Sequence, residues 1–302
     1  MTSIQVKSND VGKQKTCINI YSHRNFIKEK HFDILLSITL LKLQFNSKSM
    51  GMLSKNNIKF INSLRVKKYR NENGYFIAEG ERLVDDIINS TIRIKTLYHT
   101  KNWTDREVAS FENILISDDE MKKISGLTTP SNALALVNIP EYDISKINFS
   151  SSLTLALDGI QDPGNFGTII RVADWFGIES IICSNDTTDA FSPKVIQSCM
   201  GAISRVKVIY CNLHDFLNNF RNNLKLTVYG TFMEGSNIYD EKLSPKGIIV
   251  MGNEGNGISK EVEKLISHKI HIPTFANDRT TVESLNVAMA TAIVCSEFRR
   301  RK

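Results

Sequence analysis

Asp158-Gly-Ile-Gln-Asp-Pro-Gly-Asn-Phe-Gly-Thr-Ile-Ile-Arg171 follows a short apolar run and leads into a helical pattern. Two later segments also lie between an apolar run and a helical pattern. They are Met251-Gly-Asn-Glu-Gly-Asn-Gly-Ile-Ser259 and Ile272-Pro273 with Ser284-Leu-Asn-Val-Ala288. In an open α/β fold the loops that follow the strands meet at the carboxyl edge of the sheet, where such folds bind ligands. The three segments therefore predict one site.

Apolar β-branched runs alternate with helical patterns from residue 152 to the end of the chain. We expect strands at residues 153–157, 180–183, 206–210, 226–230, 247–251 and 269–272. Helices are expected at residues 167–176, 193–200, 215–220, 259–266 and 284–298. This order predicts an α/β domain, residues 152–302, with a mostly parallel sheet that carries helices on both faces.

Residues 52–140 show a second, smaller alternation, and residues 141–151 form a polar linker without a regular period. Helices are expected at residues 56–69, 81–88 and 118–124, and strands at 75–78, 92–98, 114–116 and 133–137. The first helix carries a basic cluster with an aromatic residue inside it, Arg65, Lys67, Lys68, Tyr69 and Arg70. The cluster is either a solvated helix face or a contact surface for RNA.

Residues 1–51 differ from the rest of the chain in charge. They hold eight basic and three acidic residues, or +5 of the total formal charge of +6, so the remaining body is nearly neutral. The apolar stretch at residues 34–45 is too short to span a bilayer, and no convincing cleavage site follows it. Because the orderly pattern begins at Met52, and Met50 and Met52 are both candidate starts, we expect residues 1–51 to be dispensable.

The cysteines and histidines indicate neither a disulfide framework nor a metal site. The five cysteines are widely spaced, without a CxxC pair. A reducing cytoplasm is the expected location, with no membrane and no metal.

The glycine-rich loop at residues 252–259 resembles two nucleotide-binding patterns without satisfying either. Ile258 stands where a phosphate-binding loop requires lysine. The dinucleotide fingerprint has another glycine order and follows the first strand, whereas this loop comes late. What remains is a loop whose backbone can approach a ligand closely, with Glu254 inside it.

Together the three segments resemble the signature motifs of the SpoU-type (TrmH-like) branch of the SPOUT RNA methyltransferases, in the same order along the chain. The resemblance implies transfer of a methyl group from S-adenosylmethionine to a ribose 2′-hydroxyl of structured RNA. It also implies a trefoil knot in the C-terminal domain and a homodimer formed through that domain. Residues 52–140 resemble the family's ribosomal-protein-like substrate domain, which favours ribosomal over transfer RNA.

Carried over by motif, the resemblance implies roles for individual residues. The expected catalytic residues are Asn165, Arg171, Glu254, Ser284 and Asn286. Main-chain groups around Gly252, Ile272 and Leu285, with Thr231 nearby, are expected to hold the cofactor. A guanidinium hardly ever deprotonates in a protein, so we expect Arg171 to clamp a phosphate rather than to act as a base.

Two alternatives to an active methyltransferase stay open. A catalytically silent protein of this fold would bind RNA, for example during ribosome assembly. The presence of all five expected catalytic residues argues against it. A methyltransferase or nucleotide-binding enzyme of another fold is a distant third, since its glycine motif would follow the first strand. Asn165 and Asn286 also lie where residues that only cap helices are found.

Overall fold

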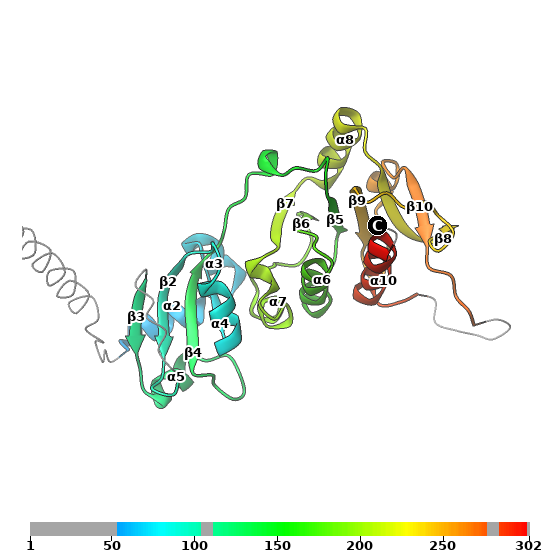
Figure 1. Cartoon of the computed structure of the whole chain (residues 1–302). Helices are drawn as coiled ribbons and strands as arrows, with labels where there is room; N and C mark the ends of the chain where they lie inside the picture. Colours follow the sequence, from blue (N-terminus) through cyan, green and yellow to red (C-terminus); the bar gives the residue numbers. More distant parts are fainter. Residues whose placement is uncertain (1–52, 104–110, 277–283, 301–302) are drawn as a thin grey trace, which may run out of the picture. The chain divides into compact units, whose positions relative to one another are not determined.

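The computed structural model describes residues 53–103, 111–276 and 284–300. Residues 1–51, for which we expect no essential role, lie outside these ranges. Residues 50–302 form one compact unit with two sheets, one of four strands and one of six (Figure 1). None of the helices in the described ranges is long and apolar enough to cross a membrane.

The four-stranded sheet has the order β1-β4-β2-β3, made of β1 (Tyr75–Glu79), β4 (Ala133–Asn138), β2 (Ile94–His99) and β3 (Glu112–Leu115). Strand β4 is antiparallel to both of its neighbours, and β2 and β3 are parallel. Helix α4 (Glu81–Ile88) covers one face, and α2 (Lys55–Ser63) with α5 (Asp118–Ile124) covers the other. This is the small α/β layer that the sequence predicts.

The helix expected at residues 56–69 is instead two helices, α2 and α3 (Lys67–Asn73). Val66, between them, has an extended backbone with φ −96° and ψ 130°, so the chain changes direction before α3. Gly74 ends α3 with φ 72°, a left-handed conformation that glycine adopts without steric cost. The break matters for the basic cluster, because residues before and after it no longer share one helix face.

The six-stranded sheet is parallel throughout, in the order β10-β8-β9-β5-β6-β7. Its strands are β5 (Leu153–Asp158), β6 (Ser180–Ser184), β7 (Lys207–Cys211), β8 (Val228–Asn237), β9 (Gly247–Gly252) and β10 (His268–His271). Asp158, the last residue of β5, lies opposite Gly252, the last residue of β9. The loops that follow β5 and β9 therefore leave the sheet side by side.

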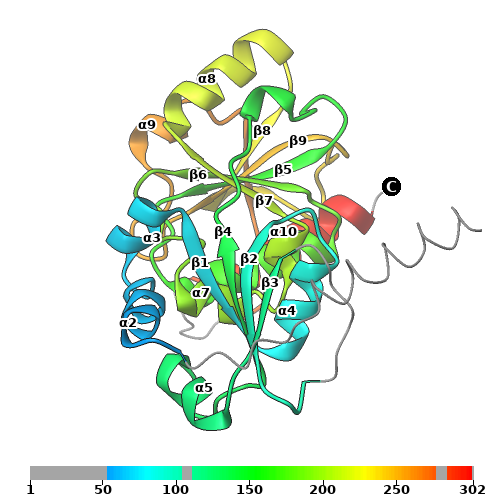
Figure 2. The ribbon, with the colours of Figure 1, turned by 90° about the vertical axis from the view of Figure 1, so that its left-hand side faces the viewer.

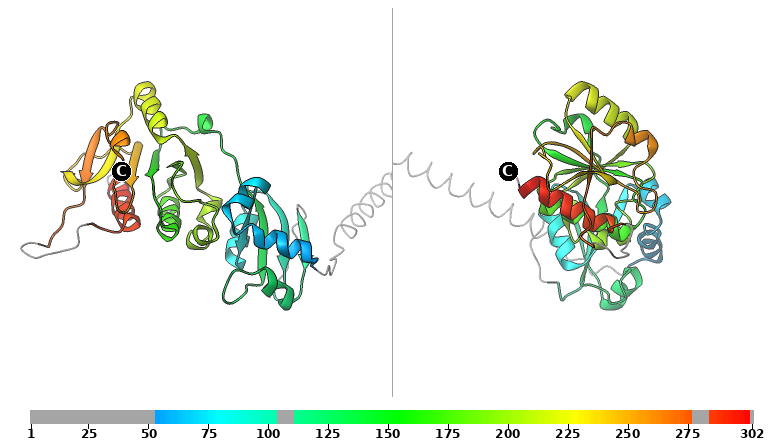
Figure 3. Two further views of the ribbon diagram at one scale, coloured as in Figure 1. Left: turned by 180° about the vertical axis from the view of Figure 1, so that it is seen from behind. Right: turned by 90° about the vertical axis from the view of Figure 1, so that its right-hand side faces the viewer.

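Helices cover both faces of this sheet, as predicted. On one face α6 (Pro163–Trp175) packs between α7 (Pro193–Ser198) and α10 (Val287–Arg300), and Figures 1 and 3 show the three in a row. Helices α8 (Leu213–Leu224) and α9 (Lys260–Glu263) cover the other face (Figure 2). Alternate strand residues serve the two layers, so Leu155 and Leu157 face the α6 side whereas Ala156 faces α8.

Two short 3-10 turns complete the described elements, one in the linker (Ile144–Lys146) and one after α7 (Ala202–Ser204). Close packing of α6 on α7 depends on Gly167. A Cβ at this position would overlap Ser198 and lie 2.9 Å from the Val195 carbonyl oxygen. The glycine therefore sets how near the two helices can come, although it is a poor helix former.

Candidate active site

The site begins at the first turn of α6. The Asp162 side chain accepts a hydrogen bond from the Asn165 backbone amide at 2.7 Å, and Pro163 follows at the first helical position. This is the usual start of a helix, because proline lacks a backbone N–H and the cap satisfies a free one. It places the Asn165 side chain at the carboxyl edge of the sheet.

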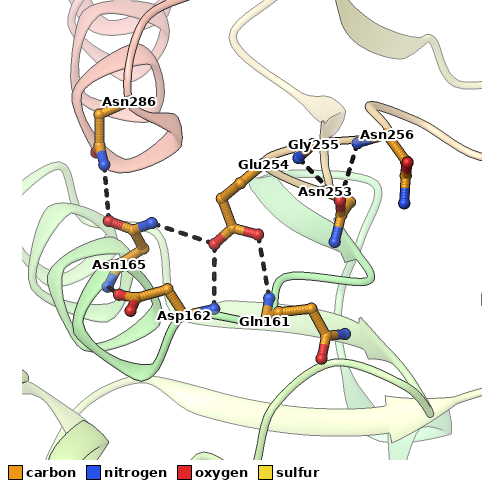
Figure 4. Close-up of a pocket in the computed structure, with 8 residues that line it drawn as sticks. All are labelled: Gln161, Asp162, Asn165, Asn253, Glu254, Gly255, Asn256 and Asn286. Carbon is orange, nitrogen blue, oxygen red and sulfur yellow. Dashed lines mark hydrogen bonds between the residues drawn. The ribbon is translucent and has the colours of Figure 1, made fainter.

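Asn165 joins the other two segments through its side-chain amide (Figure 4). Its Nδ2 donates to Glu254 Oε1 at 3.1 Å, and its Oδ1 accepts from Asn286 Nδ2 at 2.9 Å. Asn286 Oδ1 in turn accepts from the backbone amides of Ala288 and Met289, at 3.0 and 3.3 Å. Because those amides can only donate, they fix the orientation of Asn286, and Asn286 fixes that of Asn165.

Glu254 is the acceptor at the end of this chain of hydrogen bonds. Its carboxylate also accepts from the backbone amides of Gln161 and Asp162, each at 3.2 Å. Partial burial alone would raise the pKa of Glu254, but the hydrogen bonds from Asn165 and from backbone amides outweigh it and lower the pKa. Glu254 is therefore an ionised acceptor near neutral pH rather than a proton donor.

The loop that carries Glu254 is fastened by Asn253. Asn253 and Gly257 exchange two backbone hydrogen bonds of 2.9 Å each, and Asn253 Oδ1 accepts from the amides of Gly255 and Asn256. Asn253 Nδ2 reaches across to the Gly159 carbonyl oxygen at 2.6 Å. The loop after β9 is thus tied both to itself and to the loop after β5.

The structure gives a steric reason for glycine at position 252. A Cβ on Gly252 would overlap the backbone of Gly257 and Ile258, where the loop folds back on its own start. Steric need within the loop therefore requires glycine here, and the expectation that its main chain holds the cofactor stays a prediction.

A cavity of about 770 Å³ opens over these loops. All three segments line it, through Gln161, Asp162, Asn165, Asn253, Glu254, Gly255, Asn256 and Asn286. Of the five expected catalytic residues, Asn165, Glu254 and Asn286 are brought together, with Asn165 hydrogen-bonded to each of the other two.

Arg171 and Ser284 do not line this cavity. Arg171 lies six residues after Asn165 on α6, which corresponds to roughly 9 Å along the helix and a rotation of about 240°. Its side chain is exposed and makes no hydrogen bond or ion pair with the described part of the chain. Ser284 is also exposed, next to residues 277–283, which lie outside the described ranges.

The four residues expected to hold the cofactor lie around the ends of neighbouring strands. Thr231 is on β8, Gly252 ends β9, Ile272 follows β10 and Leu285 precedes α10. The Thr231 hydroxyl donates to the Val250 carbonyl oxygen at 3.2 Å, which ties β8 to β9 at this edge. None of the four lines the cavity of 770 Å³. Gly252 and Leu285 are the direct sequence neighbours of Asn253 and Asn286, which line it, whereas Thr231 and Ile272 belong to β8 and to the end of β10.

The residues of the basic cluster in the small domain differ in their exposure to solvent. Lys67 and Lys68 are exposed, whereas Arg70 is only 2% exposed. Arg70 Nη2 binds Asp189 Oδ2 at 2.6 Å, and its Nη1 donates to the Leu64 carbonyl oxygen at 2.8 Å. Arg70 is therefore a structural residue, and the expectation that it contacts RNA does not fit its burial. Arg65 is half-buried and hydrogen-bonded to the Ile124 carbonyl oxygen.

Sequence reasoning missed Gln161, Asp162 and Asn253. The Asp162-Pro163 pair is a helix-start signal that could have placed the beginning of α6, expected at residue 167, four residues earlier. Nothing in a single sequence distinguishes Asn253 from Asn256 as the residue that fastens the loop.

Comparisons with known proteins agree with this geometry. Residues 152–296 match the family model of the SpoU rRNA Methylase family, and residues 55–135 match that of an MRM3-like substrate binding domain. The 23S rRNA (guanosine(2553)-2′-O)-methyltransferase RlmP of Bacillus subtilis is 29% identical over 240 residues, which cover 78% of this chain and 93% of that protein.

Two solved structures are similar over most of the chain. A TrmH-family protein of Porphyromonas gingivalis is 40% identical with a TM-score of 0.76, and the alignment covers 83% of this chain and 100% of that one. The AdoMet-bound rRNA methyltransferase of Sinorhizobium meliloti is 28% identical with a TM-score of 0.72, covering 83% and 97%. With its three signature segments meeting in one site, the chain belongs to the SpoU (TrmH) family of S-adenosylmethionine-dependent RNA 2′-O-ribose methyltransferases.

Proposed function

We propose that this protein methylates a ribose 2′-hydroxyl of ribosomal RNA. The observation that carries the proposal is the hydrogen-bonded junction of Asn165, Glu254 and Asn286 at the carboxyl edge of the sheet. It brings the family's three segments into one cavity. The relative RlmP is named as an enzyme of this kind, and the match to a substrate-binding domain at residues 55–135 supports an RNA substrate.

The residues present suit S-adenosylmethionine, whose sulfonium methyl is already activated for transfer. Backbone groups at the ends of β8, β9 and β10 are neutral donors and acceptors, and Ile272 and Leu285 supply apolar surface. Within the described ranges no cluster of side chains could hold a metal ion. We expect the cofactor to bind in the presence of a chelator and to stabilise the protein more as its concentration rises.

A ribose hydroxyl is a weak nucleophile at neutral pH, so the protein must position it and help its proton leave. Asn165 and Asn286 offer a rigid neutral platform, since their amides are already oriented. Glu254 accepts hydrogen bonds from the loop after β5 and from Asn165 on α6, and so holds that platform in place. Arg171 would clamp the adjacent phosphate, lower the hydroxyl's pKa and leave a phosphate oxygen to receive the proton.

Arg171 does not line the cavity of its own chain, and helix geometry turns it away from Asn165. We propose that a second copy supplies it, in a homodimer formed through α6 and α10. Trp175, one turn beyond Arg171 on the same helix face, is 85% exposed, and Met289 on the adjacent α10 is 61% exposed. Large apolar side chains in such positions are typical of an interface.

Four further expectations remain part of the proposal. The insertion of β9 between β8 and β5, with α10 returning to α6, is compatible with a trefoil knot in the C-terminal domain. The small domain is proposed to be ribosomal-protein-like and to bind RNA through Lys67 and Lys68. The four described cysteines are free, which suits the reducing cytoplasm that we expect. Ser284 is proposed to contact the ribose.

The deciding experiment is to map ribose methylation in total RNA from wild-type cells and from cells that lack the gene. We expect one ribosomal 2′-O-methyl group to disappear and to return when the gene is restored. Identical maps would support the silent RNA-binding protein instead. Titration of the purified protein with S-adenosylmethionine provides the second readout, because a silent protein that has lost its cofactor site would show no binding.

A further inference from the structure

A second cavity, of about 510 Å³, lies where α7 packs against β1 of the small sheet. Its volume is in the range of sites that bind small organic molecules. The buried side chain of Ile77 and the half-buried Leu127 give it an apolar floor. The established family site, over the loops after β5 and β9, shares no lining residue with this cavity.

Two cations border the second cavity without a carboxylate partner among the described residues. Arg65 is held by neutral oxygens, with Nη2 at 2.6 Å from the Ile124 carbonyl and Nε at 3.3 Å from Asn62 Oδ1. Its Nη1 lies directly over Gly126, where a Cβ would overlap it. The positive charge of Arg65 is thus fixed in place but not neutralised. Lys194, on α7, is exposed and free to move.

One acidic residue, Glu79, also lines the cavity, so the two cations exceed the carboxylates of the lining by one charge. Its buried carboxylate accepts hydrogen bonds from the Ser125 hydroxyl and, at 2.8 Å, from the Gly126 amide. The Glu79 carbonyl oxygen accepts from Gln197 Nε2 at 3.4 Å. The lining therefore combines a net positive charge with an exposed amide and an apolar floor. That combination suits a nucleotide, with phosphate at the cations and base over the floor.

Lys194 connects this cavity with the active site. A Cβ on Gly164 would lie 4.0 Å from Lys194 Cε and 2.9 Å from Asp162 Oδ1. Gly164 stands between Asp162 and Asn165, which both line the first cavity. The flexible stem of Lys194 therefore passes beside the first turn of α6, and its ammonium can serve a phosphate that lies between the two cavities.

We propose, resting on the proposed function, that the second cavity binds a nucleotide adjacent to the methylated one in the RNA strand. Lys194 contacts the phosphate between the two nucleotides, and Arg65 contacts the phosphate beyond the bound one. The base lies on the apolar floor, within reach of Gln197. This assigns part of the substrate recognition to the junction of the small domain with α7.

The test uses the full-length protein and unmethylated ribosomal RNA from cells that lack the gene. The variants are Lys194→Ala, Lys194→Arg and Gln197→Trp, which fills the cavity from an exposed position. Lys260→Ala, at an exposed lysine of α9 on the opposite face of the sheet, is the matched control. RNA affinity is measured over a series of salt concentrations, together with cofactor affinity, thermal stability and the methyl-transfer rate at saturating RNA.

We expect Lys194→Ala to weaken RNA binding by roughly three- to tenfold and to reduce the salt slope by about one phosphate contact. Lys194→Arg should keep most of the affinity. Gln197→Trp should weaken binding without changing the salt slope, because it excludes the base rather than removing a charge. Cofactor affinity and thermal stability should stay at the wild-type values in all three.

The proposal is overturned if Lys194→Ala binds RNA with the same affinity and salt slope as Lys260→Ala. It is also overturned if Gln197→Trp binds RNA as tightly as the wild-type protein does. A fall in the methyl-transfer rate at saturating RNA, with unchanged affinity, would place Lys194 in the reaction itself and also overturn it. Failure of the wild-type protein to transfer methyl groups would refute the proposed function alone. The binding series would then still decide the role of the cavity.

Discussion

The two ends of α6 differ in how completely the single chain satisfies them. At the first turn, Asp162 and Asn165 are joined by hydrogen bonds to Glu254 and Asn286, so four side chains from three segments hold one geometry. Further along the same helix, Arg171 and Trp175 project into solvent without hydrogen bonds to the described residues. The polar side chains at the first turn find their hydrogen-bond partners within the chain. Arg171 and Trp175 remain exposed and available to a binding partner.

The difference teaches which part of the catalytic arrangement exists before assembly. A platform of oriented amides costs little reorganisation when substrate arrives, because its hydrogen bonds are already made. In the proposed dimer, the exposed guanidinium of Arg171 becomes ordered only when RNA and the second copy bind. We therefore expect substitutions at the exposed end of α6 to lower the methyl-transfer rate most. Substitutions at the first turn should lower it less, because the remaining hydrogen bonds keep part of the geometry.

The largest expected effect is that of Arg171→Ala. Methyl transfer should fall by orders of magnitude, because the lost phosphate contact belongs mainly to the transition state. Cofactor affinity should be unchanged, since Arg171 is not among the residues expected to hold the cofactor. Arg171→Lys should rescue little, because a point charge cannot form the planar fork of a guanidinium. Single-turnover transfer of labelled methyl to unmethylated RNA measures the effect.

Mixing experiments sharpen this prediction. A chain with Arg171→Ala is combined with a chain that carries Asn165→Ala and Glu254→Ala, and the subunits are allowed to exchange. If Arg171 serves the partner's site, each mixed dimer holds one intact site, and about a quarter of the wild-type sites should be restored. No recovery after verified exchange would mean that Arg171 acts within its own chain. Near-normal turnover of Arg171→Ala alone would end its catalytic assignment.

Arg70 offers the same contrast inside α3, where it is buried while Lys67 and Lys68 are exposed. Its side chain is 3% exposed and pairs with Asp189, which is 13% exposed. Arg70→Ala leaves that carboxylate buried without its partner, which typically costs about 3–5 kcal/mol of folding stability. Chemical denaturation of the variant measures this cost.

The double variant Arg70→Ala with Asp189→Ala provides the control. It removes both charges, so its destabilisation should be clearly less than the sum of the two single changes. Additive effects would show that Arg70 and Asp189 act independently, against the geometry of the pair. If Arg70→Ala leaves the free energy of unfolding unchanged, the ion pair with Asp189 contributes nothing to folding. Arg70 would then again be a candidate for the RNA contacts expected from the sequence.

The sequence was sufficient for the strands of both sheets, because apolar β-branched runs bounded by glycine and polar residues leave little alternative. It was also sufficient for the meeting of the three segments, since carboxyl ends of parallel strands must share one edge, whereas the choice of Asn165, Glu254 and Asn286 within them came from the family resemblance. The start of α6 was placed too late because Gly164 and Gly167 weaken the helical pattern. Gly167 is required by the close packing of α6 against α7, a contact that only the folded structure reveals.

The sequence alone could not show which residues of the basic cluster are exposed and which are buried. Charge and periodicity are alike for Arg65, Lys67, Lys68 and Arg70, and the break at Val66 carries no proline or glycine to announce it. Burial of Arg70 depends on Asp189, a residue 119 positions away. Long-range partners of this kind are set by tertiary packing, which overrides local pattern.

Asn165→Ala tests the first turn of α6 and should have a milder effect than Arg171→Ala. It removes the two side-chain hydrogen bonds to Glu254 and Asn286, and we expect a loss in methyl transfer on the order of 1–3 kcal/mol. Because Asn286 acts on the site through Asn165, adding Asn286→Ala should cost little more. A double-mutant cycle with single-turnover rates checks this coupling. Strictly additive losses would mean that the two asparagines contact the substrate separately.

The smallest expected effects belong to Lys67→Ala and Lys68→Ala, at the exposed positions of α3. Each lysine that contacts a phosphate should weaken RNA binding a few-fold at moderate salt and reduce the salt slope by about one. Folding stability should stay at the wild-type value, since among the described residues the only ion pair of either lysine is the exposed one of Lys68 with Glu72 at 3.8 Å. RNA binding across a salt series, beside denaturation, separates the two consequences. A loss of stability with unchanged RNA affinity would show that these lysines only support the helix, and that α3 takes no part in RNA binding.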